Sequence, residues 1–279
     1  MTIHATDVVI VGGGMVGGAL ALGLAQQGFT VTVIEKNAPP VFDASSPPDV
    51  RISAISASSV GLLRGLGVWD SVRSMRAHAY RQLETWEWES AHVVFNAAEL
   101  KLPELGYMVE NNVLQRALWQ ALEAHERILL QVGTSLQEMR RGETYTTLTL
   151  TDGSQLDARL VVGADGASSQ VRQLAGIGIH AWQYQQSCML ISVQCADDPG
   201  DSTWQQFTPA GPRAFLPLFD HWASLVWYDA PARIRQLQGM SMAQLQQEIT
   251  RHFPSRLGEI TPLSAGAFPL TRRHALQYV

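Results

Sequence analysis

Residues and motifs that are typical of several common protein functions are scarce in this sequence. Its 279 residues include only two cysteines, Cys188 and Cys195, seven positions apart in one apolar segment. Along an extended strand this separation is too long for a disulfide, so we interpret both as reduced core thiols in a reducing compartment. The eight histidines show no H-x-x-x-H spacing and no Cys/His cluster. A protein-bound metal is therefore not expected.

The distribution of charge and of hydrophobic residues argues against further classes of protein. The basic residues form no run and the formal net charge is −5, so we expect no nucleic-acid-binding surface. No Gly-x-Ser-x-Gly motif of a hydrolase occurs. The apolar run Val8–Leu24 resembles a signal peptide or membrane span, but no Lys or Arg precedes it and six of its seventeen residues are glycine. We interpret it as a strand, a turn and a buried helix, and expect a cytoplasmic protein.

The first pattern that carries chemistry is a glycine-rich turn. A predicted strand, Asp7–Val11, leads into the G-x-G-x-x-G sequence Gly12-Gly13-Gly14-Met15-Val16-Gly17, and a predicted helix (Met15–Gln26) and strand (Thr30–Glu35) follow. Such glycines let the backbone approach a pyrophosphate, and the helix N-terminus offers it free N–H groups. Glu35 has the spacing of an acid that binds an adenosine ribose and repels a 2′-phosphate. The pattern predicts FAD or NAD binding; the alternative is a turn that binds nothing.

A second pattern follows the short apolar run Leu160–Gly163, which we predict to be a buried strand. It continues as Ala164-Asp165-Gly166, and Ser168 and Arg172 lie on the helix predicted next. Asp-Gly by itself most often marks a tight turn. The carboxyl end of a strand in an open α/β sheet is, however, where ligands bind. We therefore regard Asp165 and Gly166 as candidate site residues.

The remaining periodicities place other elements along the chain. Asn37–Asp49 is rich in Pro, Ser and Asp, and predicts an exposed and mobile loop before Arg51–Ile55 resumes order. The further predicted helices are Ala57–Leu66, Asn111–Ala124 with Asn111 or Asn112 as N-cap, and Met242–His252. The further predicted strands are Leu83–Glu89, Ile128–Val132, two within Thr134–Asp157, Ser187–Gln194, Trp204–Phe207, Ala214–Phe219 and Ala223–Tyr228. After Gly176 the composition changes, which indicates a second, mostly antiparallel domain.

These motifs resemble those of class A flavoprotein aromatic hydroxylases of the para-hydroxybenzoate hydroxylase type. Gly12, Gly14, Gly17 and Glu35 match the family's first FAD motif, and Asp165-Gly166 matches a second motif that serves FAD and the nicotinamide nucleotide. The resemblance implies further cofactor contacts at Met15, Val16 and Lys36 beside the first motif, at Arg51 and Asn111 near the flavin, and at Val132 near the adenine. It implies no catalytic side chain that we can name.

Within that family the chain is similar to the ubiquinone-biosynthesis hydroxylases of bacteria. The segments typical of them are Asp49–Ser56, Leu66–Asp70, Val109–Asn111, Phe215–Leu218 and Phe268–Thr271. The resemblance implies an FAD-dependent monooxygenase that hydroxylates the ring of a polyprenyl benzoquinol or phenol with NAD(P)H and O2. It also implies peripheral contact with the inner membrane and other ubiquinone-biosynthesis proteins as partners.

The same resemblance implies an α/β fold with two discontinuous domains. We expect a Rossmann-like FAD-binding domain over 1–75 and 108–178, and a mixed α+β substrate domain on an antiparallel sheet over 76–107 and 179–270. The family carries a third, Gly-Asp motif for the flavin's ribityl chain, and this sequence stops at Val279 before one occurs. We therefore expect a truncated chain that binds FAD weakly and does not turn over.

Three other functions remain open at this stage. An FAD-dependent dehydrogenase or prenyl reductase shares the first motif and would insert no oxygen. An NAD-dependent Rossmann dehydrogenase would leave the Asp165-Gly166 motif without a role. A non-catalytic subunit of a biosynthetic complex is the third alternative. The flavin absorbance of the protein, followed by NAD(P)H oxidation with and without a quinol, separates them.

Overall fold

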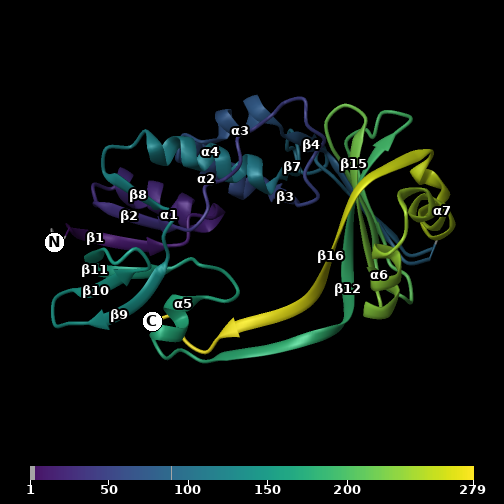
Figure 1. Cartoon of the computed structure of the whole chain (residues 1–279). Helices are drawn as coiled ribbons and strands as arrows, with labels where there is room; N and C mark the ends of the chain where they lie inside the picture. Colours follow the sequence, from purple (N-terminus) through teal and green to yellow (C-terminus); the bar gives the residue numbers. More distant parts are fainter. Residues whose placement is uncertain (1–3, 89) are drawn as a thin grey trace.

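The computed structural model describes residues 4–88 and 90–279, and their strands form three sheets (Figure 1). The first sheet has the order β8-β2-β1-β11-β10-β9. Its strands are β1 (His4–Val11), β2 (Val31–Glu35), β8 (Ile128–Val132), β9 (Leu136–Arg141), β10 (Thr146–Leu150) and β11 (Gln155–Gly163). Strands β8, β2, β1 and β11 run parallel, so their carboxyl ends meet at one edge of the sheet.

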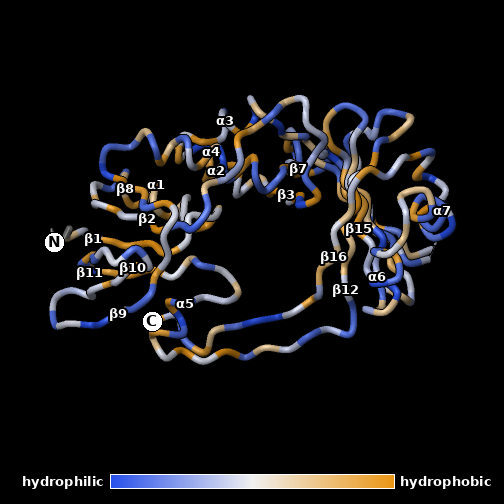
Figure 2. Tube along the Cα trace, viewed as in Figure 1, coloured by the Kyte–Doolittle hydropathy of each residue, from blue (hydrophilic) through white to orange (hydrophobic). Residues whose placement is uncertain are grey.

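Two helices cover one face of this sheet because their sequences present apolar residues to it. Helix α1 (Met15–Gln26) is apolar nearly all round, and α4 (Asn111–Glu123) carries one apolar stripe. Together with β1 and β2 they bury a core that includes Ile10, Leu22, Val33 and Leu118. Figure 2 shows apolar residues concentrated along β1, as expected for a strand covered on both faces.

A small sheet of order β3-β7-β4 lies between the two larger parts of the molecule (Figure 1). Its strands are β3 (Ile52–Ser56), β4 (His78–Tyr80) and β7 (Gly106–Glu110), and helices α2 (Ala57–Gly65) and α3 (Trp69–Met75) lie between β3 and β4 in the chain. Strand β7 leads directly into α4. The small sheet thus places the start of α4 between the first sheet and the third.

The third sheet has seven strands, in the order β16-β12-β15-β14-β13-β5-β6, and only β13 and β5 pair parallel. The strands are β5 (Gln82–Trp86), β6 (His92–Asn96), β12 (Ile179–Cys195), β13 (Ser202–Gln206), β14 (Arg213–Pro217), β15 (Trp222–Asp229) and β16 (Ile260–Ala275). Helices α6 (Pro231–Gln238) and α7 (Met242–His252) pack on one face. Their contacts bury a second core around Ile191, Leu225 and Trp227.

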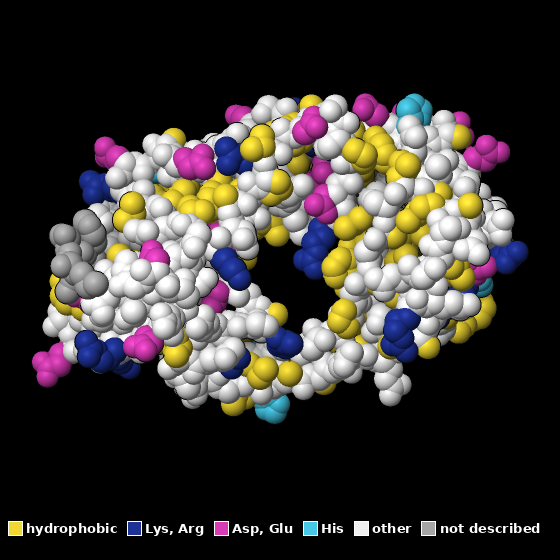
Figure 3. Space-filling view, viewed as in Figure 1, with side chains coloured by type: hydrophobic (Ala, Val, Ile, Leu, Met, Phe, Trp, Pro, Cys, Tyr) yellow, Lys and Arg dark blue, Asp and Glu magenta, His cyan; other side chains and the backbone are white. Residues whose placement is uncertain are grey.

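Strands β12 and β16 extend beyond this sheet as a two-stranded ribbon (Figure 1). The ribbon reaches the turn after β11, where Arg273 donates to the carbonyl of Ala167 (2.8 Å), and helix α5 (Gln170–Leu174) lies beside it. The molecule therefore surrounds an opening, which the space-filling view shows with basic side chains at its margin (Figure 3). This opening separates the first sheet from the uncovered face of the third.

The expected fold class is confirmed, and several local predictions need correction. Asn111 is the first residue of α4 and Glu110 is the N-cap. The predicted strand Leu160–Gly163 is the end of the longer β11. The strand predicted over Leu83–Glu89 ends at Trp86 as β5, and Glu89 lies outside the described residues. Helices α3 and α6 and strands β4, β6, β7 and β16 were not predicted.

Three further observations on the described residues concern the cysteines, possible metal ligands and possible membrane-spanning helices. Cys188 and Cys195 are free and buried, and burial raises the pKa of each thiol to about 11. Among residues 4–88 and 90–279 no group of three or more His, Cys, Asp and Glu side chains gathers as metal ligands would. No helix in the same residues is both long enough and apolar enough to cross a membrane.

Candidate functional site

The glycine loop between β1 and α1 is packed so closely that two of its glycines admit no side chain. A Cβ on Gly12 would lie 2.3 Å from the carbonyl oxygen of Ala164, and Gly12 has a φ of 107°. A Cβ on Gly17 would lie 1.9 Å from the carbonyl oxygen of Gly12. A Cβ on Gly14 would meet no atom within 4 Å. The loop is therefore compact on its inner side and open at Gly14.

The open side of the loop is the N-terminus of α1. Gly14 is the N-cap, no side chain caps the helix, and the first turn contains no acidic residue. Val16 in this turn is 75% exposed. The first turn of a helix carries N–H groups without intrahelical partners and the positive end of the dipole. An anion would therefore be stabilised beside Gly14, Met15 and Val16.

Glu35 lies at the end of β2 and directs its carboxylate at the same loop. Its Oε2 accepts the N–H of Gly13 (2.7 Å), and its Oε1 accepts the N–H of Asn37 (3.1 Å). Glu35 pairs in register with Val132 at the end of β8, and Val132 is exposed. Carboxylate oxygens hold further lone pairs, so Glu35 can also accept from a ribose hydroxyl. The next residue, Lys36, is exposed.

The second motif lies directly beside the first. Val11 pairs with Gly163, and the N–H of Ala164 donates to the carbonyl of Val11 (2.8 Å). Asp165 Oδ2 accepts the N–H groups of Gln170 (2.6 Å) and Val171 (3.1 Å) at the start of α5. Its Oδ1 is buried and has no hydrogen-bond partner within the described chain.

Neighbours of Asp165 complete this turn. Gly166 has a φ of 77°, which favours glycine there. The guanidinium of Arg172 donates to the carbonyl of Ile177 (2.7 Å), so its charge stabilises the turn after α5 instead of facing the glycine loop. The hydroxyl of Ser168 lies 3.4 Å from Arg273 of the β12/β16 ribbon. The ribbon thus contacts the second motif directly.

Arg51 and Asn111 lie together near the start of α4. The N–H of Asn111 donates to the carbonyl of Arg51 (3.0 Å), and Asn111 Oδ1 accepts from the Ser53 hydroxyl (2.6 Å). The guanidinium of Arg51 lies over the ring of Phe268 on β16, 4.6 Å from its centroid. Both residues thus lie where the small sheet meets the third sheet, at the start of α4.

Sequence reasoning missed two residues that contact the glycine loop from α4. Trp119 Nε1 and Gln115 Nε2 both donate to the carbonyl oxygen of Gly13, at 2.7 and 3.1 Å. Their spacing of four residues places them on one face of the helix. That spacing was the one available signal, and it does not reveal a partner about a hundred residues earlier in the chain.

The face of the third sheet opposite α6 and α7 looks onto the opening (Figure 1). Its residues are mainly apolar: Cys188, Leu190, Ala214, Leu216, Val226, Tyr228 and Leu270. At the start of the ribbon this face continues into a groove of about 520 Å³. Its lining consists of Tyr184, Gln186, Pro212, Tyr228 and residues 270–273. Burial raises the pKa of the Tyr228 phenol, so it is protonated at neutral pH and can donate a hydrogen bond.

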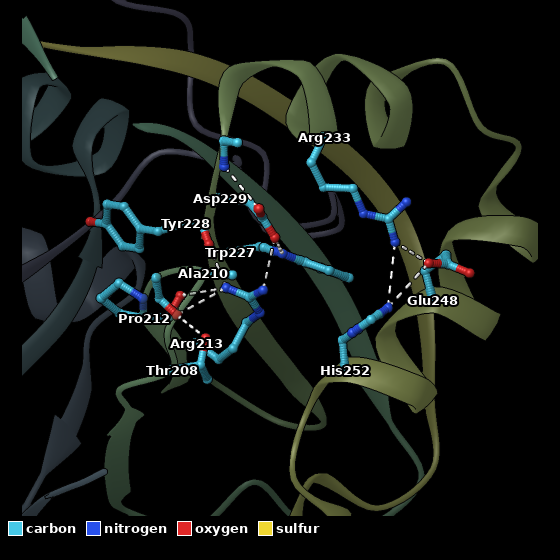
Figure 4. A network of polar contacts seen from close by, with 12 residues as sticks. Thr208, Ala210, Pro212, Arg213, Trp227, Tyr228, Asp229, Arg233, Glu248 and His252 are labelled. Carbon is cyan, nitrogen blue, oxygen red and sulfur yellow. Dashed lines mark hydrogen bonds and ion pairs between the residues drawn. The ribbon is translucent and has the colours of Figure 1, made fainter. Parts of the chain in front are cut away.

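A buried arginine fixes one side of this groove (Figure 4). Arg213 donates to the carbonyls of Gly211 (3.1 Å), Pro212 (3.2 Å) and Tyr228, and it pairs with Asp229 (3.0 Å). Burial lowers the pKa of Arg213, and the nearby Asp229 opposes this shift. The aromatic residues Trp204, Phe215 and Trp227 lie in the core under the helices, so they do not line the opening.

Family comparison defines the class of protein. A model described as an FAD binding domain matches residues 5–278, so the chain belongs to this family, in which FAD is the cofactor. Its relatives are flavin-dependent hydroxylases and monooxygenases. The enzyme class and cofactor that the sequence implied are thereby confirmed, with NAD(P)H as the usual co-substrate of the class.

Two individual relatives show which hydroxylases the chain is similar to. The chain is 74% identical over 279 residues to the 3-demethoxyubiquinol 3-hydroxylase of Escherichia coli, covering 100% of this chain and 71% of the relative. It is 34% identical to the ubiquinone hydroxylase UbiL of Rhodospirillum rubrum, over 98% of this chain and 63% of that protein. The similarity to ubiquinone-biosynthesis hydroxylases that the sequence motifs indicated is confirmed.

Solved structures share the fold at lower identity. The p-nitrophenol 4-monooxygenase PnpA of Pseudomonas putida superposes with a TM-score of 0.76 at 18% identity, over 98% of this chain and 70% of that one. A ternary complex of aklavinone-11 hydroxylase with FAD and aklavinone gives 0.74 at 22% identity, over 100% and 56%. These structures establish that the arrangement of sheets is that of flavin-dependent monooxygenases.

Proposed function

We propose that this chain binds FAD and a polyprenyl benzoquinol, and serves a hydroxylation of the quinol ring that uses NAD(P)H and O2. The observation that carries the proposal is the glycine loop at α1, which is closed at Gly12 and Gly17 and open at Gly14. The substrate class is supported by the relative that is named for hydroxylating demethoxyubiquinol.

Each end of the cofactor has a proposed set of contacts. The pyrophosphate lies against Gly12, Gly14, Met15, Val16 and Gly17, where the N-terminus of α1 is uncapped. Glu35 accepts from the adenosine ribose, with Lys36 and Val132 beside the adenine. Asp165 and Gly166 face the same edge of the sheet, and the unpartnered Oδ1 of Asp165 fits a ligand hydroxyl or N–H group.

At the flavin end the proposed contacts are Arg51 and Asn111. A bound flavin supplies the redox and oxygen chemistry, and the protein supplies orientation and a pocket with little water. Arg51 lies over Phe268 and Asn111 bonds to Ser53, so both side chains are held in place before any ligand binds. His221 is exposed at the turn between β14 and β15, and we assign it no role in the reaction.

The substrate side of the opening fits an apolar ligand. The wall formed by Leu190, Leu216 and Val226 offers ring contacts, and the phenol of Tyr228 offers one hydrogen-bond donor. The groove beside Tyr184 and Pro212 continues this wall outward. We infer that the wall takes the quinol ring and the groove takes the start of the prenyl tail. Peripheral membrane contact and other biosynthesis proteins as partners stay proposals.

The cofactor assignment is tested with Gly14→Ala. Gly14 has a φ of −69° and open space around its Cβ, so alanine fits the fold and occupies only the space proposed for the pyrophosphate. The melting temperature should stay within a few degrees, while FAD binding, measured by flavin fluorescence, weakens about tenfold or more. Gly61→Ala in α2 is the control, because its Cβ also meets nothing. Unchanged FAD affinity in Gly14→Ala contradicts the assignment.

The tail groove is tested with Leu270→Glu and two benzoquinones, one with a decyl tail and one without. The charge should weaken binding of the tailed compound at least tenfold and leave the other unchanged, because only the tail contacts the groove. Binding is followed by tryptophan fluorescence. Leu263→Glu is the control, since Leu263 is an exposed residue of the same strand outside the groove lining. Equal losses for both compounds would contradict a tail site.

Oxygen insertion separates the hydroxylase from an FAD-dependent dehydrogenase or prenyl reductase. The chain spans 71% of its E. coli relative, so this test joins it to the part of that relative that it does not span. Supplied with FAD, NAD(P)H, a demethoxyubiquinol analogue and isotopically labelled O2, the joined protein should yield a labelled ring hydroxyl. An oxidised or reduced product without label supports the alternative.

A further inference from the structure

The two peptide units that meet at Gly13 are each held by side chains far away in the sequence. The carbonyl oxygen of Gly13 accepts two hydrogen bonds from α4, from Trp119 Nε1 (2.7 Å) and Gln115 Nε2 (3.1 Å). The N–H of Gly13 donates to Glu35 Oε2 (2.7 Å). The orientation of Gly13 is therefore set by three side chains and not by the glycine loop alone.

This orientation determines where the next N–H group points. In a planar trans peptide the C=O of one residue and the N–H of the following residue point in opposite directions. The C=O of Gly13 points at α4, so the N–H of Gly14 points away from α4. A Cβ on Gly14 would meet no atom within 4 Å, so there is free space beside Gly14.

We propose that Trp119 and Gln115 are positioning residues of the cofactor site, which aim the N–H of Gly14 at the pyrophosphate. The inference rests on the proposed FAD site. Neither side chain contacts the cofactor; each acts through the carbonyl of Gly13. Two donors on one carbonyl leave the peptide unit little freedom to rotate, so the loop is preorganised before the ligand arrives.

A second tryptophan in the same core shows that the Trp119 hydrogen bond is not a general requirement of packing. Trp69 and Trp119 are both 1% exposed and belong to one apolar cluster. The indole N–H of Trp69 has no partner within the described chain, whereas that of Trp119 bonds to Gly13. The two residues differ in their hydrogen bonding and not in their burial.

The experiment compares Trp119→Phe with Trp69→Phe in the full chain. Both changes remove the same atoms from the same core, and both should lower the melting temperature, Trp119→Phe more because it also loses a buried hydrogen bond. Only Trp119→Phe removes a donor from Gly13, and it should weaken ADP and FAD binding about five- to tenfold. Trp69→Phe should change both affinities less than about twofold. Calorimetric titration with ADP, adenosine and FAD provides the measurements.

The ratio of ADP to adenosine affinity isolates the pyrophosphate contact. Adenosine lacks the pyrophosphate, so its binding should be the same in all variants, and the ratio should fall only when a donor to Gly13 is lost. Gln115→Leu should lower the ratio as well. The double variant Trp119→Phe, Gln115→Leu should lose less than the product of the single losses if both act on one carbonyl.

The outcomes are distinguishable. If the wild-type chain binds neither ADP nor FAD, the proposed cofactor site fails and the inference fails with it. If the wild type binds both and Trp119→Phe matches Trp69→Phe in the ADP-to-adenosine ratio, only the inference is overturned. A ratio that falls in Trp119→Phe and Gln115→Leu, and stays constant in Trp69→Phe, supports it.

Discussion

Glu84 shows how a single buried carboxylate connects several elements around the third sheet. It lies on β5 and accepts hydrogen bonds from Arg256 at 2.8 and 2.9 Å, from Ser202 at 2.9 Å and from His92 at 3.1 Å. The guanidinium of Arg256 also lies over two indole rings, those of Trp86 and Trp204. The hydrogen bonds from Arg256 are the main reason that the pKa of Glu84 is lowered to about 2.

The first prediction concerns acid stability. Glu84 has an ordinary pKa of 4.5 and a pKa of about 2 in the fold, so its contribution is fully present above about pH 4.5 and is lost as pH falls toward 2. Glu84→Gln should lower the free energy of unfolding by about 1–3 kcal/mol at pH 7, with a smaller deficit near pH 3. Urea unfolding at pH 7, 4 and 3 measures this.

The control for that prediction is Asp201→Asn, which breaks an exposed ion pair with Arg81. Exposed pairs contribute about 0–1 kcal/mol, so this variant should follow the wild type at each pH. A deficit in Glu84→Gln that stays constant from pH 7 to pH 3 would show that the charge of Glu84 is not the source of its contribution.

At the scale of elements, the loop between β2 and β3 is held by one buried arginine. The sequence predicted an exposed, mobile loop over Asn37–Asp49. Arg76 pairs with the buried Glu110 (3.1 Å) and donates to the carbonyls of Asp43 (2.8 Å) and Ser46 (2.6 Å). Glu110 also accepts the N–H of Asp49 (2.8 Å). The second half of the loop, residues 43–49, therefore bonds to this ion pair and is attached to the core.

The second prediction follows from that ion pair. Arg76→Met leaves the carboxylate of Glu110 buried without its partner, which should cost about 3–5 kcal/mol of unfolding free energy. Limited proteolysis should also cut the segment 42–49 faster. The double variant Arg76→Met, Glu110→Gln should recover part of the loss because it buries no unpaired charge. If Arg76→Met alone costs less than about 1 kcal/mol, the loop is held by other contacts.

Elements with strong local patterns could be predicted from the sequence. The bounds predicted for α1, α7 and β8 are those observed, because each is marked locally in the sequence: α1 is a continuous apolar segment after the glycine loop, and α7 has an apolar stripe and a capping box at Ser241. Strand β16 was missed because Pro262 and Pro269 argue against a strand. Proline is tolerated there because β16 is an edge strand of its sheet.

The candidate site likewise has one part that could be predicted from the sequence and one part that could not. The glycine loop and Glu35 lie within one βαβ unit. The glycine pattern and its spacing to the acidic residue therefore identify this part of the site from the sequence alone. Trp119 and Gln115 act on Gly13 across about a hundred residues, and helical periodicity identifies them only as one face of α4. Glu84 was predicted on a strand with one apolar face, but the buried face carries this charge because Arg256, far along the chain, neutralises it.

At the scale of the whole molecule, two separate apolar cores are joined by few elements. One core lies between the first sheet and helices α1 and α4, and the other between the third sheet and helices α6 and α7. The small β3-β7-β4 sheet and the β12/β16 ribbon connect them on either side of the opening (Figures 1 and 3). This arrangement supports the proposed division into 1–75 with 108–178 and 76–107 with 179–270.

The third prediction is that the two parts unfold separately. Leu118 and Leu225 are each fully buried, the first in the core at α4 and the second in the core at α6 and α7. Replacing either leucine with alanine should cost about 2–5 kcal/mol. Because each core packs chiefly against its own sheet, Leu118→Ala should lower one calorimetric transition and Leu225→Ala another. ADP should raise only the transition that Leu118→Ala lowers, since its proposed site lies at the first sheet. One transition that both variants lower equally would mean that the small sheet and the ribbon couple the cores into a single cooperative unit.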